Sequence, residues 1–546
     1  MIKTILGACR RHPAVAAMLF TAMMLLPMAA LVPFNTKGEP REAIVALSML
    51  LSGDWVLPVS FGADIPYKPP FLAWMIALFS LPTGHVTEFT SRLPSVIAAV
   101  ALAGTVVSFA RRDMGWSAGR SLCAALLTLT CVEVWRNAGV CRVDMVLTAA
   151  ITGATVTLER LAVRGGFMRF VGATALMTVA VLTKGPVGMV LPCLIIAVWA
   201  FAARLRPRRI LALAGIVALA ALVSLVLPGW WYYEAYLQGG EEFYRLAMEE
   251  NVGRMTGTMS YASHENPWYY NLITLVAGLA PYTLLLLLRA ARVRRSQLSS
   301  HKPGHGAMLC IVAATVTLVF YTIPASKRSV YLLPMYPFLA LGILVCWEWL
   351  AARAMKLERL FSGLIRGVGA AVCVALAAAP FVVRDTDFNV CLCVGAALST
   401  AWVVARRGAL RDLKVIPYTL ALVTVILTVI GIAILPPIME AKTDRPLAET
   451  IVANAAPDEP VWEYITQDPL LRYYTAGFYT GDRIRLLPAD PLTAGDGWLV
   501  TSPDDAAALA AANPGLTLTR VWATPRRSCD TRRPAALYRL RVQQEL

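Results

Sequence analysis

Long apolar segments recur along most of this 546-residue chain, and they restrict its fold more than any other feature. A helix needs about 20 mostly apolar residues to cross a bilayer core, and about thirteen segments qualify. They are 13–33, 92–110, 116–135, 143–162, 168–183, 186–203, 210–229, 269–288, 307–324, 330–350, 367–383, 388–405 and 415–436. Only 15% of the residues are charged, against about 25% in soluble proteins. The sequence therefore predicts an α-helical integral membrane protein rather than a soluble globule.

The positive charge indicates which face of the membrane each connection occupies. The chain has 50 Lys and Arg against 34 Asp and Glu, a net charge of +16. About half of the 50 lie at the N-terminus and in alternate connections, which the positive-inside rule assigns to the cytoplasm. The excess charge is thus largely a topology signal, and nucleic acid is not an expected partner. The first apolar segment lacks a small-residue cleavage site, so we expect it to be retained as a helix.

The opposite, outer face carries the long loops 34–90 and 230–268. The chain is expected to divide into a transmembrane domain, 1–436, and an extracytoplasmic tail, 437–546. Short alternating runs at 460–465 and 497–501 predict strands, and 466–477 and 504–512 predict helices. The tail is therefore predicted to be a small α/β domain on the outer side. In the first loop, residues 43–51 have the spacing of an amphipathic helix lying on the membrane surface.

Ionisable residues near membrane depth are costly and are often functional. Lys184 interrupts an apolar stretch directly before Gly185 and Pro186, where a helix must break, so its ammonium is expected to face a cavity. Snorkelling of this side chain to the interface is the alternative. Asp144 stands where the fourth apolar segment begins, and stabilisation by the helix dipole alone would also account for it there.

Cations on the outer face oppose the usual charge distribution and call for an anionic ligand. Lys327 and Arg328 share one short outer loop, with Tyr331 after them. Together with other outer cations they would form an electropositive pocket suited to phosphate: Lys68, Lys184, Arg254, Lys327 and Arg328. The carboxylates Glu39 and Asp144 would face this pocket. Cations for a phosphate leaving group and a carboxylate base are what group transfer from a phosphate ester requires.

The sequence predicts no definite cofactor or metal centre. The eleven cysteines are scattered, most of them inside apolar runs, so neither a disulfide framework nor a zinc ribbon is expected. Only His85 and His264 of the five histidines fall on the outer side. A divalent metal held by His264 and carboxylates is the remaining possibility.

Between about residues 34 and 340 the chain carries a series of motifs that resemble, in the same order, those of a known family. The matching motifs are Glu39-Pro40-Arg41, 49–55, 67–70, Arg92-Leu93-Pro94, Asp144, 183–186, Glu249 with Asn251 and Arg254, 267–270 and 331–334. They are similar to the bacterial polyprenyl-phosphate-sugar glycosyltransferases, which include the aminoarabinose transferases and proteins like the dolichyl-phosphate-mannose protein mannosyltransferases.

The resemblance implies a fold, a reaction and a set of site residues. It implies a GT-C-type fold, a polyprenyl-phosphate-linked sugar donor and inversion at the anomeric carbon. Glu39 and Asp144 correspond to the catalytic acids of the family. Substrate-binding roles fall on the following residues: Arg41, Lys68, Lys184, Glu249, Arg254, His264, Lys327, Arg328 and Tyr331.

Two positions depart from the family pattern. The usual first-loop sequence is Asp-Glu-x-Arg-Tyr, and here Gly38 replaces the aspartate, which leaves Glu39 to serve. Aminoarabinose transferases also often carry Glu before the loop lysine, where this chain has Tyr67. The second departure argues against a metal at His264 and against aminoarabinose as the sugar.

The sequence as a whole predicts a glycosyltransferase in the bacterial inner membrane. It would move a hexosyl or pentosyl group from the lipid-linked donor to a hydroxyl of lipid A, another glycan or a protein on the periplasmic face. A non-enzymatic flippase of lipid-linked glycans is the alternative. Internal repeats and midplane charges are expected of a transporter, and neither is evident in the sequence. A third hypothesis is that Gly38 marks a member with lost or altered catalysis.

Overall fold

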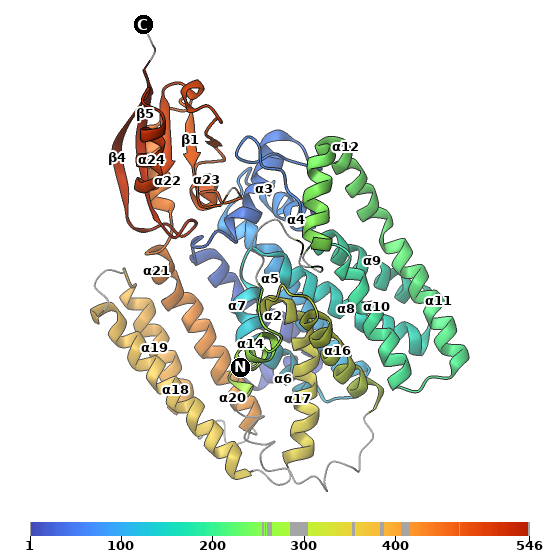
Figure 1. Ribbon diagram of the computed structural model, residues 1–546. Helices are drawn as coiled ribbons and strands as arrows, with labels where there is room; N and C mark the ends of the chain where they lie inside the picture. The colour runs from blue at the N-terminus through green and yellow to red at the C-terminus, as the bar shows by residue number, and fades with distance from the viewer. Residues whose placement is uncertain are drawn as a thin grey trace. The chain divides into compact units, whose positions relative to one another are not determined.

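The structure is a computed structural model, shown in Figure 1, and it describes most of the chain. The described residues are 2–253, 256, 258, 265–283, 304–351, 355–382, 387–405, 415–468 and 470–543. They fall into two compact units, each formed by segments far apart in the sequence. We call residues 1–29, 67–71 and 93–434 the helical unit, and residues 30–66, 72–92 and 435–546 the mixed unit.

The helical unit consists almost wholly of helices. Its elements are α1 (Ile2–Arg11), α2 (Pro13–Leu31), α5 (Glu88–Arg112), α6 (Ala118–Thr130), α7 (Val132–Ala138), α8 (Val143–Arg164), α9 (Phe167–Lys184), α10 (Val187–Ala202), α11 (Pro207–Ser224), α12 (Val226–Met248), η1 (Glu249–Gly253), α14 (Tyr270–Gly278), α16 (His305–Thr322), η3 (Ser329–Met335), α17 (Tyr336–Ala351), α18 (Met355–Val382), α19 (Val390–Ala405), α20 (Val415–Val429) and η4 (Ile430–Ile434). Helices α2 and α5 continue for a few residues into the mixed unit.

Each of the thirteen predicted apolar segments lies on one or more of these helices, in whole or in part. Among the described residues, eight helices are long and apolar enough to cross a membrane, or nine if the pair α6 and α7, bent by 74°, counts as one span. The other predicted segments lie on shorter helices, including α10, α14 and α19. The prediction of a multi-span helical membrane protein is confirmed.

The break predicted after Lys184 is present between α9 and α10. Lys184 ends α9, and Gly185 adopts a φ of +75°, which side chains rarely allow. A Cβ at Gly185 would also collide with the side chain of Asn251. Pro186 then precedes the first turn of α10. The Gly-Pro pair therefore sets Lys184 at a helix terminus.

The mixed unit is built around one five-stranded sheet. Its elements are α3 (Pro40–Ser52), α4 (Phe71–Ser80), α21 (Leu435–Glu440), α22 (Arg445–Asn454), β1 (Val461–Tyr464), α23 (Tyr474–Tyr479), β2 (Ile484–Leu486), η5 (Pro491–Ala494), β3 (Gly497–Thr501), α24 (Pro503–Ala512), β4 (Leu516–Arg527) and β5 (Pro534–Val542). The strand order is β2-β1-β3-β5-β4. Strand β1 runs parallel to β2 and β3, and β5 runs antiparallel to β3 and β4.

Alternate residues of β3 serve the two faces of this sheet. Trp498 and Val500 pack in a core with α22 and α23, whereas Leu499 packs in a second core with α24. The strands predicted near 460 and 497 and the helix near 504 are confirmed. The helix predicted over 466–477 is wrong for the described residues before Tyr474, where α23 begins, because Asp468 accepts the backbone N–H of Leu470 in a local turn.

The first outer loop packs into the same unit as the tail. Ile44 of α3 is buried in the core with residues of α22 and β2, and the ring of Phe61 meets the ring of Tyr474 edge-on at 5.7 Å. Asp482 accepts the backbone N–H of Phe61 at 2.9 Å and the Ser48 hydroxyl at 3.2 Å. Part of the apolar face of α3 is therefore covered by the tail, and its position on the membrane surface stays a prediction.

Candidate active site

In the helical unit, Asp144 lies at the centre of a charged cluster. Its carboxylate, in the first turn of α8, is buried. Lys184 Nζ lies 2.6 Å from one oxygen, and Arg142 Nε lies 3.3 Å from the other. The Lys184 ammonium also stands 4.6 Å from the ring centroid of Tyr331. The structure thus brings together three residues that the sequence predicted separately, Asp144, Lys184 and Tyr331.

Local backbone structure explains how the cluster forms. Arg142 is extended and stands immediately before α8, while Lys184 ends α9, so chain breaks bring both cations to Asp144. Tyr331 is buried in η3, and its ring stacks at a tilt on that of Tyr321, with centroids 5.4 Å apart. This packing fixes an aromatic face beside the Lys184 ammonium. Arg142 was not among the predicted binding residues, although it stands only two residues before Asp144.

Lys327 and Arg328 lie in the segment that leads into η3. The buried ammonium of Lys327 donates to the carbonyl of Pro324 at 2.6 Å, so the loop itself satisfies this cation. Arg328 adds positive potential at the Asp144 carboxylate. Of the two cations, Arg328 therefore acts on the cluster and Lys327 mainly holds its own loop.

Two further predicted binding residues of the helical unit, Glu249 and Lys68, make contacts with their own neighbours in sequence. Glu249 begins the π-helical turn η1 and lies 3.8 Å from Arg245. The Lys68 ammonium stands 5.9 Å from the ring centroid of the neighbouring Tyr67. Arg254 and His264 lie outside the described residues.

Glu39 belongs to the mixed unit, where it forms a buried ion pair. Arg92, 1% exposed, donates from Nε to Oε2 at 2.7 Å and from Nη2 to Oε1 at 2.9 Å. Arg92 also donates to the backbone carbonyl of Val32 and stacks over the ring of Phe34 at 5.1 Å. This arginine therefore holds the residues before α3 in place. The sequence marked Arg92 as part of a motif but gave it no role.

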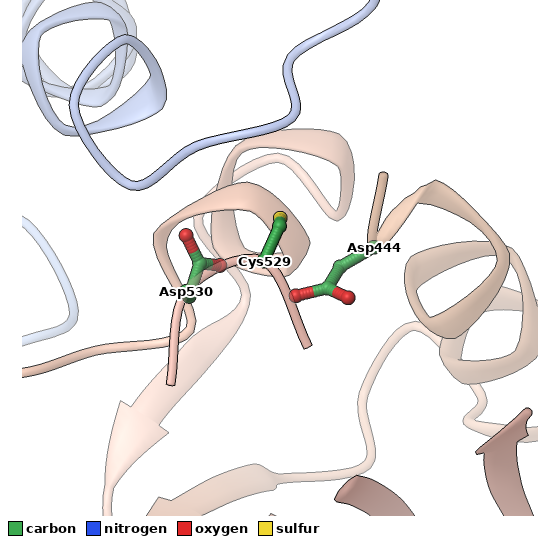
Figure 2. Close-up of side chains that lie close together, drawn as sticks. All are labelled: Asp444, Cys529 and Asp530. Carbon is green, nitrogen blue, oxygen red and sulfur yellow. The ribbon is translucent and has the colours of Figure 1, made fainter. Parts of the chain in front are cut away.

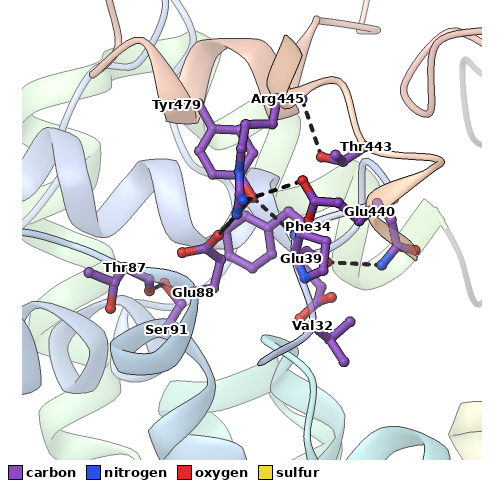
Figure 3. Close-up of polar contacts among 12 residues, drawn as sticks. Val32, Phe34, Glu39, Thr87, Glu88, Ser91, Glu440, Thr443, Arg445 and Tyr479 are labelled. Carbon is purple, nitrogen blue, oxygen red and sulfur yellow. Dashed lines mark hydrogen bonds and ion pairs between the residues drawn. The ribbon is translucent and has the colours of Figure 1, made fainter. Parts of the chain in front are cut away.

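A second polar cluster of the same unit lies one helical turn earlier on α5. Figure 3 shows the side chains of Arg445 and Tyr479 meeting Glu88. Arg445 Nη2 and the Tyr479 hydroxyl lie 2.5 Å and 2.9 Å from Glu88 Oε1. The Tyr479 oxygen in turn accepts the backbone N–H of Phe34 at 3.1 Å. The tail thus holds in place the loop that carries Glu39 and Arg41. The guanidinium of Arg41 lies 3.6 Å from the carboxylate of Glu42.

One group of described residues has the composition of a metal site. Asp444, Cys529 and Asp530 lie together in the mixed unit (Figure 2), with potential ligand atoms within 4.8 Å of one another. Hydrogen bonds already engage both carboxylates. Asp444 accepts the Ser528 hydroxyl at 2.5 Å, and Asp530 accepts the backbone N–H and hydroxyl of Thr475 at 2.8 Å and 3.0 Å. We therefore interpret this group as a structural junction.

This junction makes stability depend on pH. Burial, and for Asp530 also the neighbouring Asp444 carboxylate, raises the pKa of both groups above the ordinary value. The unfolded chain releases the Asp530 proton at lower pH than the folded chain, so folding stability falls as pH rises above the ordinary carboxyl pKa. Asp530→Asn is expected to flatten this dependence, because the amide has no proton to release between the two carboxyl pKa values.

The measurement is the thermal unfolding midpoint of the full-length protein between about pH 4 and pH 7. Asp504→Asn serves as the control, because Asp504 is an exposed aspartate at the start of α24. An unchanged slope in Asp530→Asn would contradict the assignment.

Comparison with known proteins supports the resemblance found in the sequence. The family described as dolichyl-phosphate-mannose-protein mannosyltransferase matches residues 67–231. An undecaprenyl phosphate-alpha-4-amino-4-deoxy-L-arabinose arabinosyl transferase of Pseudomonas paraeruginosa is 28% identical over 320 residues, 57% of this chain and 56% of that protein. The protein of the same name from Pectobacterium carotovorum is 26% identical over 386 residues, 68% and 66% of the two chains. The resemblance to the polyprenyl-phosphate-sugar glycosyltransferases is confirmed.

Solved structures establish the fold over nearly the whole length. ArnT from Cupriavidus metallidurans in the apo state has a TM-score of 0.72 and 20% identity, covering 98% of each chain. The same protein bound to undecaprenyl phosphate has a TM-score of 0.71 and 21% identity, covering 96% of this chain and 97% of that one. The predicted GT-C-type fold is confirmed. In sequence, the chain matches about 56% to 66% of the length of the curated relatives.

Proposed function

We propose that this protein is a membrane glycosyltransferase that moves a sugar from a polyprenyl-phosphate donor to an acceptor hydroxyl. The observation that carries the proposal is the buried Asp144 carboxylate with Lys184 at 2.6 Å and Arg142 at 3.3 Å. A carboxylate can accept a proton, and adjacent cations can bind a phosphate leaving group. The mannosyltransferase domain and the ArnT-like fold support the same chemistry.

Of the two predicted acids, Asp144 is better suited to be the base. Both oxygens of Glu39 are bound by Arg92, which is 1% exposed and anchored to the backbone. The partners of Asp144 are more accessible, because the side chains of Lys184 and Arg142 are 23% and 27% exposed. A donor phosphate can therefore draw these cations away and release the Asp144 carboxylate. A catalytic role for Glu39 stays a prediction.

The reaction we propose is a single displacement. Asp144 takes the proton of the acceptor hydroxyl while its oxygen forms a new bond to the anomeric carbon. The bond from that carbon to the phosphate oxygen breaks, and polyprenyl phosphate leaves with the electron pair. Lys184 and Arg142 stabilise the negative charge that develops on the leaving phosphate. Attack opposite the leaving group inverts the anomeric configuration.

The donor class that we propose is supported by the names of the relatives. Their names specify an undecaprenyl-phosphate-linked aminoarabinose, and a polyprenyl-phosphate sugar is the donor class that we propose here. The acceptor is a hydroxyl of lipid A, another glycan or a protein. We place the protein in the bacterial inner membrane with residues 437–546 in the periplasm, where such acceptors are found.

Deletion of the gene distinguishes a glycosyltransferase from a flippase that transports lipid-linked glycans. We expect mass spectrometry of envelope material from a deletion strain to show one glycan, glycolipid or protein that lacks a single sugar, with restoration by the wild-type gene. A flippase would instead cause the loss of whole lipid-linked glycans. An unchanged envelope under conditions in which the gene is expressed would contradict the proposal.

Lys184 allows a separate test of phosphate binding. Because its ammonium lies 2.6 Å from Asp144, closer than that of any other described cation, Lys184→Ala is expected to raise the donor KM by about tenfold or more, the loss of one charge-assisted contact. Arg208→Ala, which removes an exposed cation at the start of α11, is the control and should leave KM unchanged. Equal donor KM values in the two variants would show that Lys184 does not bind the donor.

A further inference from the structure

The β4–β5 hairpin is strongly basic. Residues 516–542 contain seven arginines and a single acid, Asp530, which is buried. Two of the arginines are paired within the unit, Arg533 with Asp505 at 3.7 Å and Arg539 with Glu459 at 2.7 Å. The other five are all exposed. The hairpin therefore presents a surplus of positive charge to its surroundings.

One end of the hairpin is fixed to the chain segment that follows the last apolar helix. That membrane-spanning segment, Thr419–Glu440, ends one residue before Ala441. Arg526 Nη1 donates to the carbonyl of Ala441 at 3.0 Å, and the Ser528 hydroxyl donates to Asp444 at 2.5 Å. The buried group in Figure 2 lies at the same point and joins Asp444 to the hairpin end.

These contacts bring a set of cations to the segment that follows the last apolar helix. Because the span ends at Glu440, the residues directly after it lie at the level of the lipid headgroups. Lys442, Arg526, Arg527 and Arg532, which we call the basic rim, are all exposed. Of the acids next to these cations in sequence, Asp444 and Asp530 are buried, and Glu440 is paired with Arg445 at 3.4 Å. Arg532 has a φ of +61° at the turn of the hairpin, beyond the end of the paired strands.

We propose that the basic rim binds the phosphate groups of anionic phospholipids at the membrane surface where the last span ends. Guanidinium groups match phosphate oxygens geometrically, and each cation near an anionic membrane surface adds about 1 kcal/mol of attraction. Binding would hold the hairpin, and through Asp444 the start of α22, against the headgroup layer. This surface is separate from the Asp144 cluster and does not depend on the proposed transfer reaction.

The test uses the purified full-length protein in a zwitterionic detergent, titrated with phosphatidylglycerol and followed by native mass spectrometry. The test variant is Arg527→Gln/Arg532→Gln, which keeps Arg526 and its bond to Ala441. The matched control is Arg520→Gln/Arg541→Gln, which removes two exposed arginines nearer the other end of the same hairpin. Both variants should keep the wild-type unfolding midpoint.

We expect the rim variant to bind phosphatidylglycerol about tenfold or more weakly than the wild type, the loss expected for two interfacial cations. The control should bind as the wild type does, and phosphatidylcholine should bind weakly to all three proteins. Equal phosphatidylglycerol affinity in the rim variant and the control would overturn the proposal. Displacement of the lipid by inorganic phosphate at similar concentration would also overturn it and assign the rim to free phosphate.

Discussion

Asp144→Asn is expected to reduce the turnover of sugar transfer by about a hundredfold to ten-thousandfold. The reason is that an amide cannot take up the proton of the hydroxyl that attacks the sugar. The substitution preserves the size of the side chain and an oxygen that can accept a hydrogen bond from Lys184. Donor binding should therefore change less than turnover. The measurement is kcat and KM for a radiolabelled polyprenyl-phosphate sugar, with the purified variant reconstituted into lipid vesicles.

Asp113→Asn provides a matched control for this loss. Asp113 is also a buried carboxylate with two cation partners in the helical unit, Arg160 at 2.6 Å and Arg164 at 3.0 Å. It lies in an Arg-rich connection that the charge distribution assigns to the cytoplasm. We expect Asp113→Asn to lower stability while turnover per folded molecule stays within about twofold, the behaviour of a residue without a role in the transition state. Equal losses of turnover in both variants would show that Asp144 has only a structural role, as a member of an ion pair.

Arg92→Met is expected to cause the largest loss of stability, about 3–5 kcal/mol, because it leaves the Glu39 carboxylate buried without a cation. It also removes the donors to the carbonyls of Val32 and Pro33. Thermal unfolding of the purified protein measures the effect. The double variant Glu39→Gln/Arg92→Met should recover much of the loss, because it no longer buries a charge.

Glu39→Gln alone then separates two roles for Glu39. If Glu39 only positions the first loop, the variant should keep kcat within about tenfold while its unfolding midpoint falls. Loss of turnover as large as that of Asp144→Asn, with unchanged stability, would make Glu39 a catalytic acid. No recovery in the double variant would contradict the account of the buried pair.

The membrane part of the fold could be predicted well from the sequence because its signals are local. Apolar length determines the spans, and Gly185-Pro186 predicts the break that exposes Lys184. Apolar length does not fix where a helix ends, since the segment 269–288 is expected as one span and α14 ends at Gly278. The association of the first loop with the tail could not be predicted in this way. Ile44 and Phe61 pack with residues about 400 positions later, and no periodicity in the sequence encodes that partner.

The candidate site could be predicted only in part for the same reason. Asp144, Lys184 and Tyr331 stood out as polar residues where apolar helices begin or end. The pairing of Arg92 with Glu39, 53 positions apart, depends on which turn of α5 faces the loop. Similarly, Glu88 and Arg445 are 357 positions apart. A single sequence shows that such charges exist but not which of them meet.

The release of polyprenyl phosphate tests the central claim most directly. The purified protein is incubated with an undecaprenyl-phosphate-linked sugar and lipids extracted from the envelope of the source cell, and free undecaprenyl phosphate is quantified by mass spectrometry with the glycosylated product. We predict equimolar release and product formation by the wild type and by Asp113→Asn, with both nearly absent in Asp144→Asn. Equal release by the wild type and Asp144→Asn would contradict the account, as would a wild type that consumes no donor.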